Sequence, residues 1–341
     1  MSEGQRGVAL TQSERDSLVD YALTLINQAR SDAGVNELTL DTNPAAQSHA
    51  EQSRDACTRG HWGTDGMKPY MRYTLAGGEQ YASENVFAID FCPEDLSNYD
   101  LETPREQIDF AMDRFLNSPG HRQNILDPHH RKVGIGITYR APTIWFVQLF
   151  VGDYVEYQTK PTIDSGILTL SGRTKNGAHV SSDTGTIAIY YDPPLEPLTR
   201  GQLSRTYCYS NGLAIAGIRP PPGDDWSYAE DETTIDVDSL QCPDPYDIPS
   251  DIPPPMSGDE AHNNWQQALD TSRDRATHQL TYPWITADEW TSDSENFTIS
   301  ADISKLLAQH GDGVYTILLW ADINSDRIPI SEYSIFIPPL P

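Results

Sequence analysis

Residues 115–136, FLNSPGHRQNILDPHHRKVGIG, join helical and extended segments around one histidine. A helical pattern ends near Asn117, Ser118 suits the N-cap of a following helix, and Pro119 suits its first position. These positions place His121 in the first turn of a short helix. Beyond it the apolar residues recur at every second position, which is typical of a β-strand. The stretch therefore predicts a helix, a short helix and a strand in succession.

The position of His121 favours a neutral imidazole, because the N-terminal end of a helix carries partial positive charge. A neutral imidazole can bind a metal ion, accept a proton or complete buried packing. The residues that lie beside His121 must decide between these roles.

The flanking segments predict an α+β unit. Apolar residues at helical spacing predict helices over residues 13–33, from about Pro44 to Cys57, and from about Pro104 to Asn117. RKVGIGITY and IWFVQLFVGDYVEY predict two antiparallel strands. Helices packed on a small sheet follow from this order of elements.

Beyond about Lys160 the pattern changes to short β-rich runs such as GILTLSGR, TIAIYYD and GVYTILLWADI, separated by turns. These runs predict an all-β, sandwich-like domain. Two exceptions are DEAHNNWQQALDTSRD, which predicts one helix, and a proline-rich loop at residues 242–258. We therefore divide the chain into residues 1–158 and residues 159–341.

Charge and cysteine content limit the partners and the compartment. A net charge of −27 with only 23 Lys and Arg repels nucleic acid, and no apolar tract is long enough for a transmembrane span. This acidity fits a well-solvated surface, a salty habitat or cation binding. The four cysteines form no C-x-x-C pair, and two fall in each half of the chain. The simplest pairing is Cys57–Cys92 with Cys208–Cys242, which indicates an extracellular or cell-surface protein. Because the N-terminus lacks an apolar signal segment, this inference requires that a signal peptide has been removed.

Motifs of common enzymes are missing, and we assign no catalytic residue. The sequence has no G-x-S-x-G, H-E-x-x-H, phosphate loop or dinucleotide fingerprint. Ser83 is the nearest candidate nucleophile, but no histidine is indicated as its base. DINSDR at residues 322–327 has partial calcium-loop spacing, but a hairpin turn is the stronger interpretation, because the following Gly and distal Glu are missing.

Two further polar residues stand near the predicted core. His61 follows the Ala-rich helix and precedes a glycine loop, and Glu84 opens an apolar strand, where a carboxylate needs a partner. A Cys57–Cys92 disulfide would close a loop that contains both. Together with His121 they would form a ligand set for Zn²⁺ or a similar divalent cation.

Five ordered motifs support this grouping: LINQARSDAGVNELTLD, AAQSHAEQSRDACTRGHW, ASENV, FLNSPGHRQNILDPHHRKVGIGI and WFVQLF. Over about residues 15–155 the chain resembles the CAP superfamily (cysteine-rich secretory proteins, antigen 5 and pathogenesis-related proteins) in its prokaryotic SCP-like form. The resemblance implies an α-β-α sandwich with a cleft of two histidines and acidic residues. Carried over, these are His61, His121 and Glu84, and Asn27 and Arg30 match an Asn-x-x-Arg pair.

This sequence also departs from the family pattern. Ser83 replaces the usual glycine, Phe115 stands where many relatives have tryptophan, and the second cleft glutamate falls at Ser118. The predicted ligand set thus lacks one carboxylate. Glu106 and Asp113 lie on the preceding helix, but no geometric reason favours either as its replacement.

The resulting expectation is a secreted or surface-attached, non-enzymatic protein. Its cleft binds a divalent cation such as Zn²⁺ through His61 and His121, or a small ligand, and its β-domain serves attachment or assembly. Expected partners are a small molecule, a lipid or an extracellular protein, with self-assembly as a further option. The lipid follows from the resemblance alone. The alternatives are a metal-assisted, peptidase-like hydrolase that uses the same cleft and a structural component of an extracellular assembly.

Overall fold

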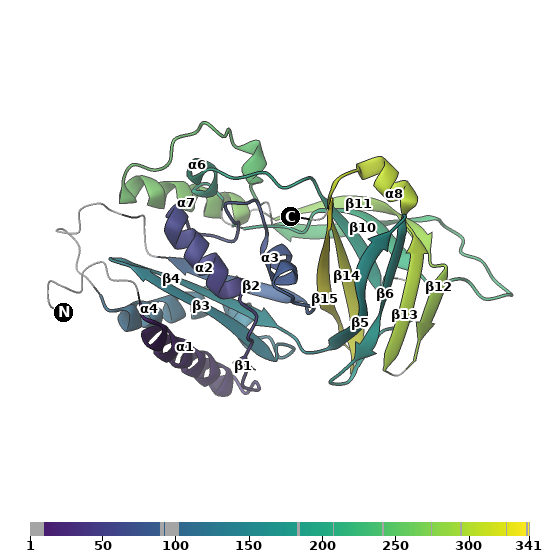
Figure 1. The fold of residues 1–341 in the computed structure, drawn as a ribbon, viewed down its shortest axis with the longest axis horizontal. Coiled ribbons are helices and arrows are strands. Elements are labelled where there is room, and N and C mark those ends of the chain that lie inside the picture. Colours follow the sequence, from purple (N-terminus) through teal and green to yellow (C-terminus); the bar gives the residue numbers. More distant parts are fainter. Residues whose placement is uncertain are drawn as a thin grey trace.

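The computed structural model describes residues 10–88, 92, 102–182, 185–206, 208–240, 242–273, 275–293, 295–324, 326–338 and 340. They form an N-terminal α/β region and a β-rich region that lie side by side (Figure 1). The N-terminal elements are α1 (Gln12–Asp32), β1 (Thr39–Leu40), α2 (Ala45–Ala56), α3 (Pro69–Leu75), β2 (Ala82–Ala88), α4 (Pro104–Leu116), α5 (Pro119–Leu126), β3 (Lys132–Arg140) and β4 (Thr143–Val151).

The β-rich region holds the remaining elements. Its strands are β5 (Val155–Asp164), β6 (Ile167–Thr174), β7 (Ala178–His179), β8 (Ile187–Asp192), β9 (Leu213–Arg219), β10 (Glu232–Leu240), β11 (Arg275–Thr286), β12 (Glu289–Ser292), β13 (Asn296–Asp302), β14 (Gly313–Ile323) and β15 (Asp326–Ile337). Its helices are α6 (Arg200–Leu203), the 3₁₀ turn η2 (Pro245–Asp247), α7 (Gly258–Arg273) and α8 (Ser304–His310). None of the described helices is both long and apolar enough to span a membrane.

The N-terminal region is the expected α-β-α sandwich. Its sheet has the order β1-β3-β4-β2, with α1, α4 and α5 on one face and α2 and α3 on the other. Strand β4 is buried along its whole length, and its side chains alternate between the two layers. Phe146 packs with the layer of α1 and α4, whereas Trp145 and Val147 pack with the layer of α2 and α3. Strand β4 is thus the centre of both cores.

Asn27 and Arg30 hold the loops that surround α5. Arg30 is fully buried and donates hydrogen bonds to the carbonyl oxygens of Ile125 at 2.6 Å and Asp127 at 3.0 Å. Asn27 exchanges two hydrogen bonds with the backbone of Leu38, at 2.8 and 3.0 Å. Buried polar groups need such partners. The matched pair therefore has a structural role: Arg30 fixes the C-terminal end of α5, the helix that carries His121, and Asn27 fixes the segment between α1 and β1.

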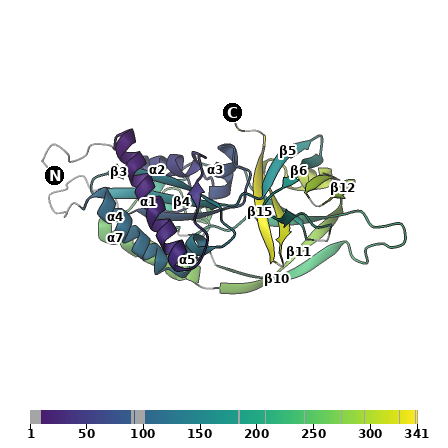
Figure 2. The same cartoon turned by 90° about the horizontal axis from the view of Figure 1, so that it is seen from below.

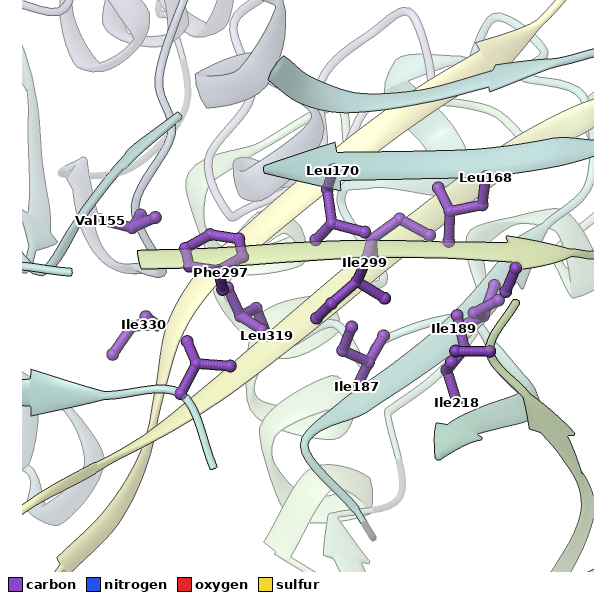
Figure 3. Packing of buried hydrophobic residues seen from close by; sticks show 14 of the residues in the cluster. Val155, Leu168, Leu170, Ile187, Ile189, Ile218, Phe297, Ile299, Leu319 and Ile330 are labelled. Carbon is purple, nitrogen blue, oxygen red and sulfur yellow. The ribbon is translucent and has the colours of Figure 1, made fainter. Parts of the chain in front are cut away.

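Two packed sheets form the β-rich region. The larger has the order β10-β11-β9-β8-β14-β15, with β7 pairing with β14, and the smaller has the order β12-β13-β6-β5. Figure 3 shows Leu170 and Phe297 of the smaller sheet in the same apolar core as Ile187 of the larger. The chain therefore has the predicted fold class, α+β with a β-rich second part. Strand β5 begins at Val155, ahead of residue 159, and the division at residue 158 stays a prediction.

The two predicted exceptions to β-structure are present. Helix α7 spans Gly258–Arg273, and residues 242–257 contain only the short turn η2. DINSDR closes the β14–β15 hairpin, in which Ile323 pairs with Asp326. Within it, Arg327 donates to Asp322 at 3.0 Å, so the hairpin interpretation is confirmed.

The N-terminal region covers the edge of the larger sheet. On edge strand β15, the carbonyl of Ile330 accepts a hydrogen bond from the amide of Tyr81 at 2.9 Å. The amide of Ser334 donates to the hydroxyl of Thr74 at 3.2 Å. An uncovered edge strand would expose such groups for pairing with another chain. The two regions therefore complete each other's backbone hydrogen bonding.

A buried ion pair also joins the two regions. The ammonium group of Lys68 lies 2.7 Å from Asp192 Oδ1 and donates to the carbonyl of Ser210 at 2.8 Å. The hydroxyl of Tyr70 donates to the second oxygen of Asp192 at 3.1 Å. The two charged side chains are only 6% and 12% exposed.

Glu332 on β15 lies in the same interface and is buried, with Oε1 lacking a hydrogen-bond partner among the described residues. Burial raises the pKa of this carboxyl to about 8, and the negative charge of Asp192 adds to this, whereas Lys68 and a hydrogen bond with Asn211 oppose it. Tyr70, Tyr81, Tyr190 and Tyr209 also lie within electrostatic range. Glu332 is therefore protonated at neutral pH in the folded protein.

Asp192→Ala should destabilise the protein by about 3–5 kcal/mol, because it leaves the Lys68 charge buried without its partner. Asp322→Ala is the matched control, because it breaks an ion pair with Arg327 whose side chains are 39% and 35% exposed. Removing an exposed pair costs about 0–1 kcal/mol. Urea unfolding of both variants measures the difference. Equal losses of stability would show that Lys68 is not buried in solution.

Glu332→Gln should stabilise the protein increasingly as pH rises from 5 to 8. In wild type the folded state keeps the Glu332 proton that the unfolded state releases, so stability falls as pH rises through this window. The neutral amide removes that loss, and the difference should reach a few kcal/mol, an order-of-magnitude figure. Urea unfolding at several pH values tests this, with Glu289→Gln on exposed β12 as control. A constant difference between Glu332→Gln and wild type would contradict the buried neutral carboxyl.

Candidate functional site

The predicted site residue Glu84 is held by a guanidinium and an imidazole. Glu84 lies on β2 with its side chain only 2% exposed. Its carboxylate accepts hydrogen bonds from Arg72 Nη2 at 2.9 and 3.2 Å, and lies 3.0 Å from His61 Nδ1. Arg72 also donates to the carbonyls of His61 and Met67, both at 2.8 Å. One arginine thus fixes both the carboxylate and the loop that carries His61.

This environment keeps Glu84 ionised. Burial by itself would raise the pKa of the carboxyl, but the charge of Arg72, then that of His49 and the hydrogen bond with His61 outweigh it. The resulting pKa is about 2. A buried carboxylate is tolerated only with such partners.

His121 lies in the first turn of α5, as predicted. Ser118 has the extended backbone of an N-cap but makes no side-chain capping bond; its hydroxyl instead lies 2.8 Å from His121 Nδ1. The ring of Phe115 lies 5.0 Å from the imidazole. Burial lowers the pKa of His121 to about 4, and the nearby charge of His61 adds to this shift. His121 is therefore neutral at pH 7.

Asn85 connects the two halves of the site. This fully buried residue follows Glu84 on β2 and donates to the carbonyl of His121 at 3.2 Å. Its side-chain oxygen accepts a hydrogen bond from Asn124 at 2.9 Å, and Asn124 also donates to the carbonyl of Glu84 at 3.4 Å. Strand β2 and helix α5 are thus held together, and the structure brings His61, Glu84 and His121 into one site.

Sequence reasoning missed Arg72 and His49. Arg72 lies on α3, a helix that the sequence patterns above do not predict, and Pro69 at its first position was the available signal. His49 is buried on α2 with Nε2 2.9 Å from the carbonyl of Gly60. Burial, followed by the charge of Arg72, lowers the pKa of His49 to about 4. No sequence signal distinguished His49 from an ordinary helix residue.

Three other candidates serve elsewhere. Ser83 interacts with the side chain of Tyr81 and has no hydrogen bond with a histidine among the described residues. Glu106 caps α4, where it accepts a hydrogen bond from the amide of Thr103 at 2.7 Å. Asp113 accepts a hydrogen bond from Asn117 at 3.1 Å. None of the three contributes a carboxylate or a nucleophile to the site.

The described residues contain no group of three or more His, Cys, Asp or Glu side chains arranged to hold a metal ion. His61 and His121 each have Nδ1 engaged, by Glu84 and Ser118 respectively. No hydrogen bond to either Nε2 is present within the part of the chain described. An imidazole whose Nδ1 is bound by a second group is the usual form of a metal-ligating histidine. Each imidazole thus has its ring orientation set through Nδ1, while Glu84 is committed to Arg72 and His61.

The β-rich region reaches this site. The ring of Tyr209 meets that of His61 edge-on, with 5.3 Å between centroids. The indole of Trp62 donates to the carbonyl of Cys208 at 3.2 Å. Cys208 is bonded to Cys242, and Cys57 to Cys92, so both expected disulfides are confirmed.

Two solved structures are similar to part of this chain, whereas no curated protein matches the sequence. An extracellular protein containing an SCP domain from Bacillus anthracis str. Ames is 23% identical, with a TM-score of 0.34, over 42% of this chain and 44% of its own. The match thus spans less than half of that protein. An outer surface protein from Borrelia burgdorferi is 17% identical, with a TM-score of 0.34, over 43% of this chain and 98% of its own.

A family comparison covers the part of the chain that carries these residues. Residues 23–150 match the model of the family CAP, described as the cysteine-rich secretory protein family. This range contains His61, Glu84 and His121 together with Arg72, which holds Glu84. Residues 23–150 of this chain are therefore a CAP domain of the cysteine-rich secretory protein family, followed by a β-rich region outside the match.

Proposed function

We propose that the CAP domain binds a divalent cation, with Zn²⁺ as the reference ion, through Nε2 of His61 and Nε2 of His121. The observation that carries this proposal is that each Nδ1 already has a partner, Glu84 at 3.0 Å and Ser118 at 2.8 Å. A bound Nδ1 fixes the ring and its tautomer and leaves Nε2 for a ligand.

Protonation supports the same assignment. Metal ligands must be deprotonated, and the pKa of His121 is lowered to about 4, mainly by burial. Glu84 orients His61 in this proposal and is not itself a ligand, since Arg72 occupies both of its oxygens. Water or a small ligand would complete the coordination.

Binding is favoured over metal-assisted hydrolysis. A hydrolase needs a general base whose pKa lies near the working pH, to activate the attacking water. The pKa of Glu84 is held at about 2 by Arg72 and its other partners, in spite of burial, so this carboxylate is a weak base. Ser83 has no histidine partner among the described residues. The proposed role is therefore binding without catalysis.

The proposed location is outside the cell or at its surface. Two disulfides support it, because such bonds persist in oxidising compartments. The β-rich region would then serve attachment or assembly, with a lipid, an extracellular protein or a second copy as partner.

Zn²⁺ should raise the melting temperature of the wild-type protein at pH 7.5. At about 100 times the dissociation constant the stabilisation is roughly 2.7 kcal/mol. His61→Ala and His121→Ala should each abolish the shift, and the double variant should lose no more than either single variant. His262→Ala, which removes an exposed histidine on α7, should keep the shift. Calorimetry of each metal-free protein, before and after addition of Zn²⁺, measures the shift in wild type and in the four variants.

The proposal is overturned if none of Zn²⁺, Mn²⁺ and Ca²⁺ changes the melting temperature of the wild-type protein. Loss of the shift in His262→Ala as well would place the cation elsewhere.

A further inference from the structure

Two segments of the β-rich region extend from the β-sandwich over the CAP domain, and their Leu195 and Tyr209 pack in one apolar cluster with Tyr70 of α3 and Val314 of β14. Together they form what we call the strap: residues 193–206, 208–212 and 242–273. The strap includes α6 and α7, which Figure 1 shows above α2, on the N-terminal side of the molecule. Figure 2 shows β10 and β11 as a ribbon that runs from the sandwich toward α7. The strap is therefore a part of the β-rich region that extends across the CAP domain.

The two segments of the strap hold each other. The Cys208–Cys242 disulfide joins them covalently. The side-chain amide of Gln202 on α6 donates hydrogen bonds to the backbone carbonyls of Pro245 at 3.0 Å and Ile248 at 2.9 Å. The disulfide and these hydrogen bonds thus hold the two segments together as one unit.

The strap is anchored to the CAP domain close to its own disulfide. The amide of Leu198 donates to the carbonyl of Thr64 at 2.8 Å, and Arg200 Nε donates to the carbonyl of Cys57 at 3.0 Å. In return, the indole of Trp62 donates to the carbonyl of Cys208. The backbone carbonyl of Cys57 in the CAP domain thus accepts a hydrogen bond from the strap, and that of Cys208 in the strap accepts one from the CAP domain.

Aromatic contacts complete the anchorage. Trp62 packs with Leu198 and Leu203 of the strap, and its ring meets that of Tyr246 edge-on at 6.1 Å. At the far end, the guanidinium of Arg59 lies 5.0 Å from the ring centroid of Trp265 on α7.

Tyr209 is the point at which the strap meets the site. Its ring stands edge-on to His61 and lies 6.2 Å from that of Tyr70. Burial is the main cause that raises the pKa of Tyr209. The side chain of His61 is only 12% exposed beneath it. Tyr209 therefore shields the imidazole from the strap side.

We propose that the strap is a lid on the CAP cleft, and that Tyr209 is the part of the lid that controls access to His61. The inference rests on the proposed function only in treating the cleft as a binding site. Opening would break these contacts together with the hydrogen bond from the buried Lys68 to the carbonyl of Ser210, so the open state is a minor population. A ligand that reaches Nε2 of His61 from the strap side does so through this open state.

Carbethoxylation of histidine by diethyl pyrocarbonate, read site by site by mass spectrometry, tests the lid without any metal or ligand. The rate at His61 is divided by the rate at His179, an exposed residue on β7. Tyr209→Ala should raise this ratio by about tenfold, which corresponds to a loss of about 1.4 kcal/mol in the free energy that favours the closed state. Tyr209→Phe keeps the ring and should leave the ratio near the wild-type value.

A second variant acts far from the imidazole. Trp265→Ala removes the aromatic partner of Arg59 on α7 and leaves Tyr209 in place, so an increase at His61 must come from opening of the strap. Trp226→Ala, which removes a half-exposed indole from the loop between β9 and β10, is the matched control. Circular dichroism and disulfide mapping establish that each variant is folded.

Unchanged His61 reactivity in both folded Tyr209→Ala and folded Trp265→Ala would overturn the lid. Should Tyr209→Ala fail to fold, Trp265→Ala decides alone. The outcome is separate from that of the proposed function. If the strap variants change His61 reactivity but metal ions do not shift the melting temperature, the lid is supported and the cation site is not. If metal ions shift the melting temperature but the strap variants leave His61 reactivity unchanged, the cation site is supported and the lid is not.

Discussion

The contact between Arg72 and the buried carboxylate of Glu84 organises the site and much of the fold around it. Glu84 lies on β2, the edge strand of the N-terminal sheet, where an ionised carboxylate is tolerated only beside a compensating charge. Arg72 supplies that charge from α3 and therefore fixes this helix against the sheet. The same guanidinium holds the backbone of the His61 loop. Helix α3 in turn packs against β15 of the second region, so the same helix joins the site to that region.

The two regions form a continuous structure in which each protects the other. The N-terminal region supplies Tyr81 and Thr74 to the free edge of β15, and the β-rich region supplies Asp192 to the buried Lys68. These groups would be costly to leave exposed or unpaired in either part alone. His61, which the family resemblance assigns to the CAP domain alone, is here in contact with Tyr209 of the other region.

The sequence named the two histidines of the candidate site but not the groups that hold them. His61, Glu84 and His121 were placed through ordered motifs, and the structure brings them together. The family pattern places a second carboxylate at Ser118, and neither Glu106 nor Asp113 replaces it. Glu106 caps α4, and Asp113 accepts a hydrogen bond from Asn117. Ser118 instead contacts the imidazole of His121 directly. The missing glutamate is thus replaced by a hydroxyl that fixes the ring.

Sequence by itself determined the features that depend on near neighbours in the chain. Alternation in β4, the helical spacing in α1 and α4, the extended Ser118 and Pro119 at the start of α5, and the pairing of four cysteines by halves were all predicted. Only the tertiary structure decided that Arg72 neutralises Glu84, that Asp192 partners Lys68 and that Tyr209 covers His61. Tyr209 and His61 are separated by 148 positions, and no local pattern of apolar spacing, capping or turn residues encodes which distant side chains meet. Such pairs are selected by the burial of charge and apolar surface when the two regions pack together, because only then does an unpaired group become costly.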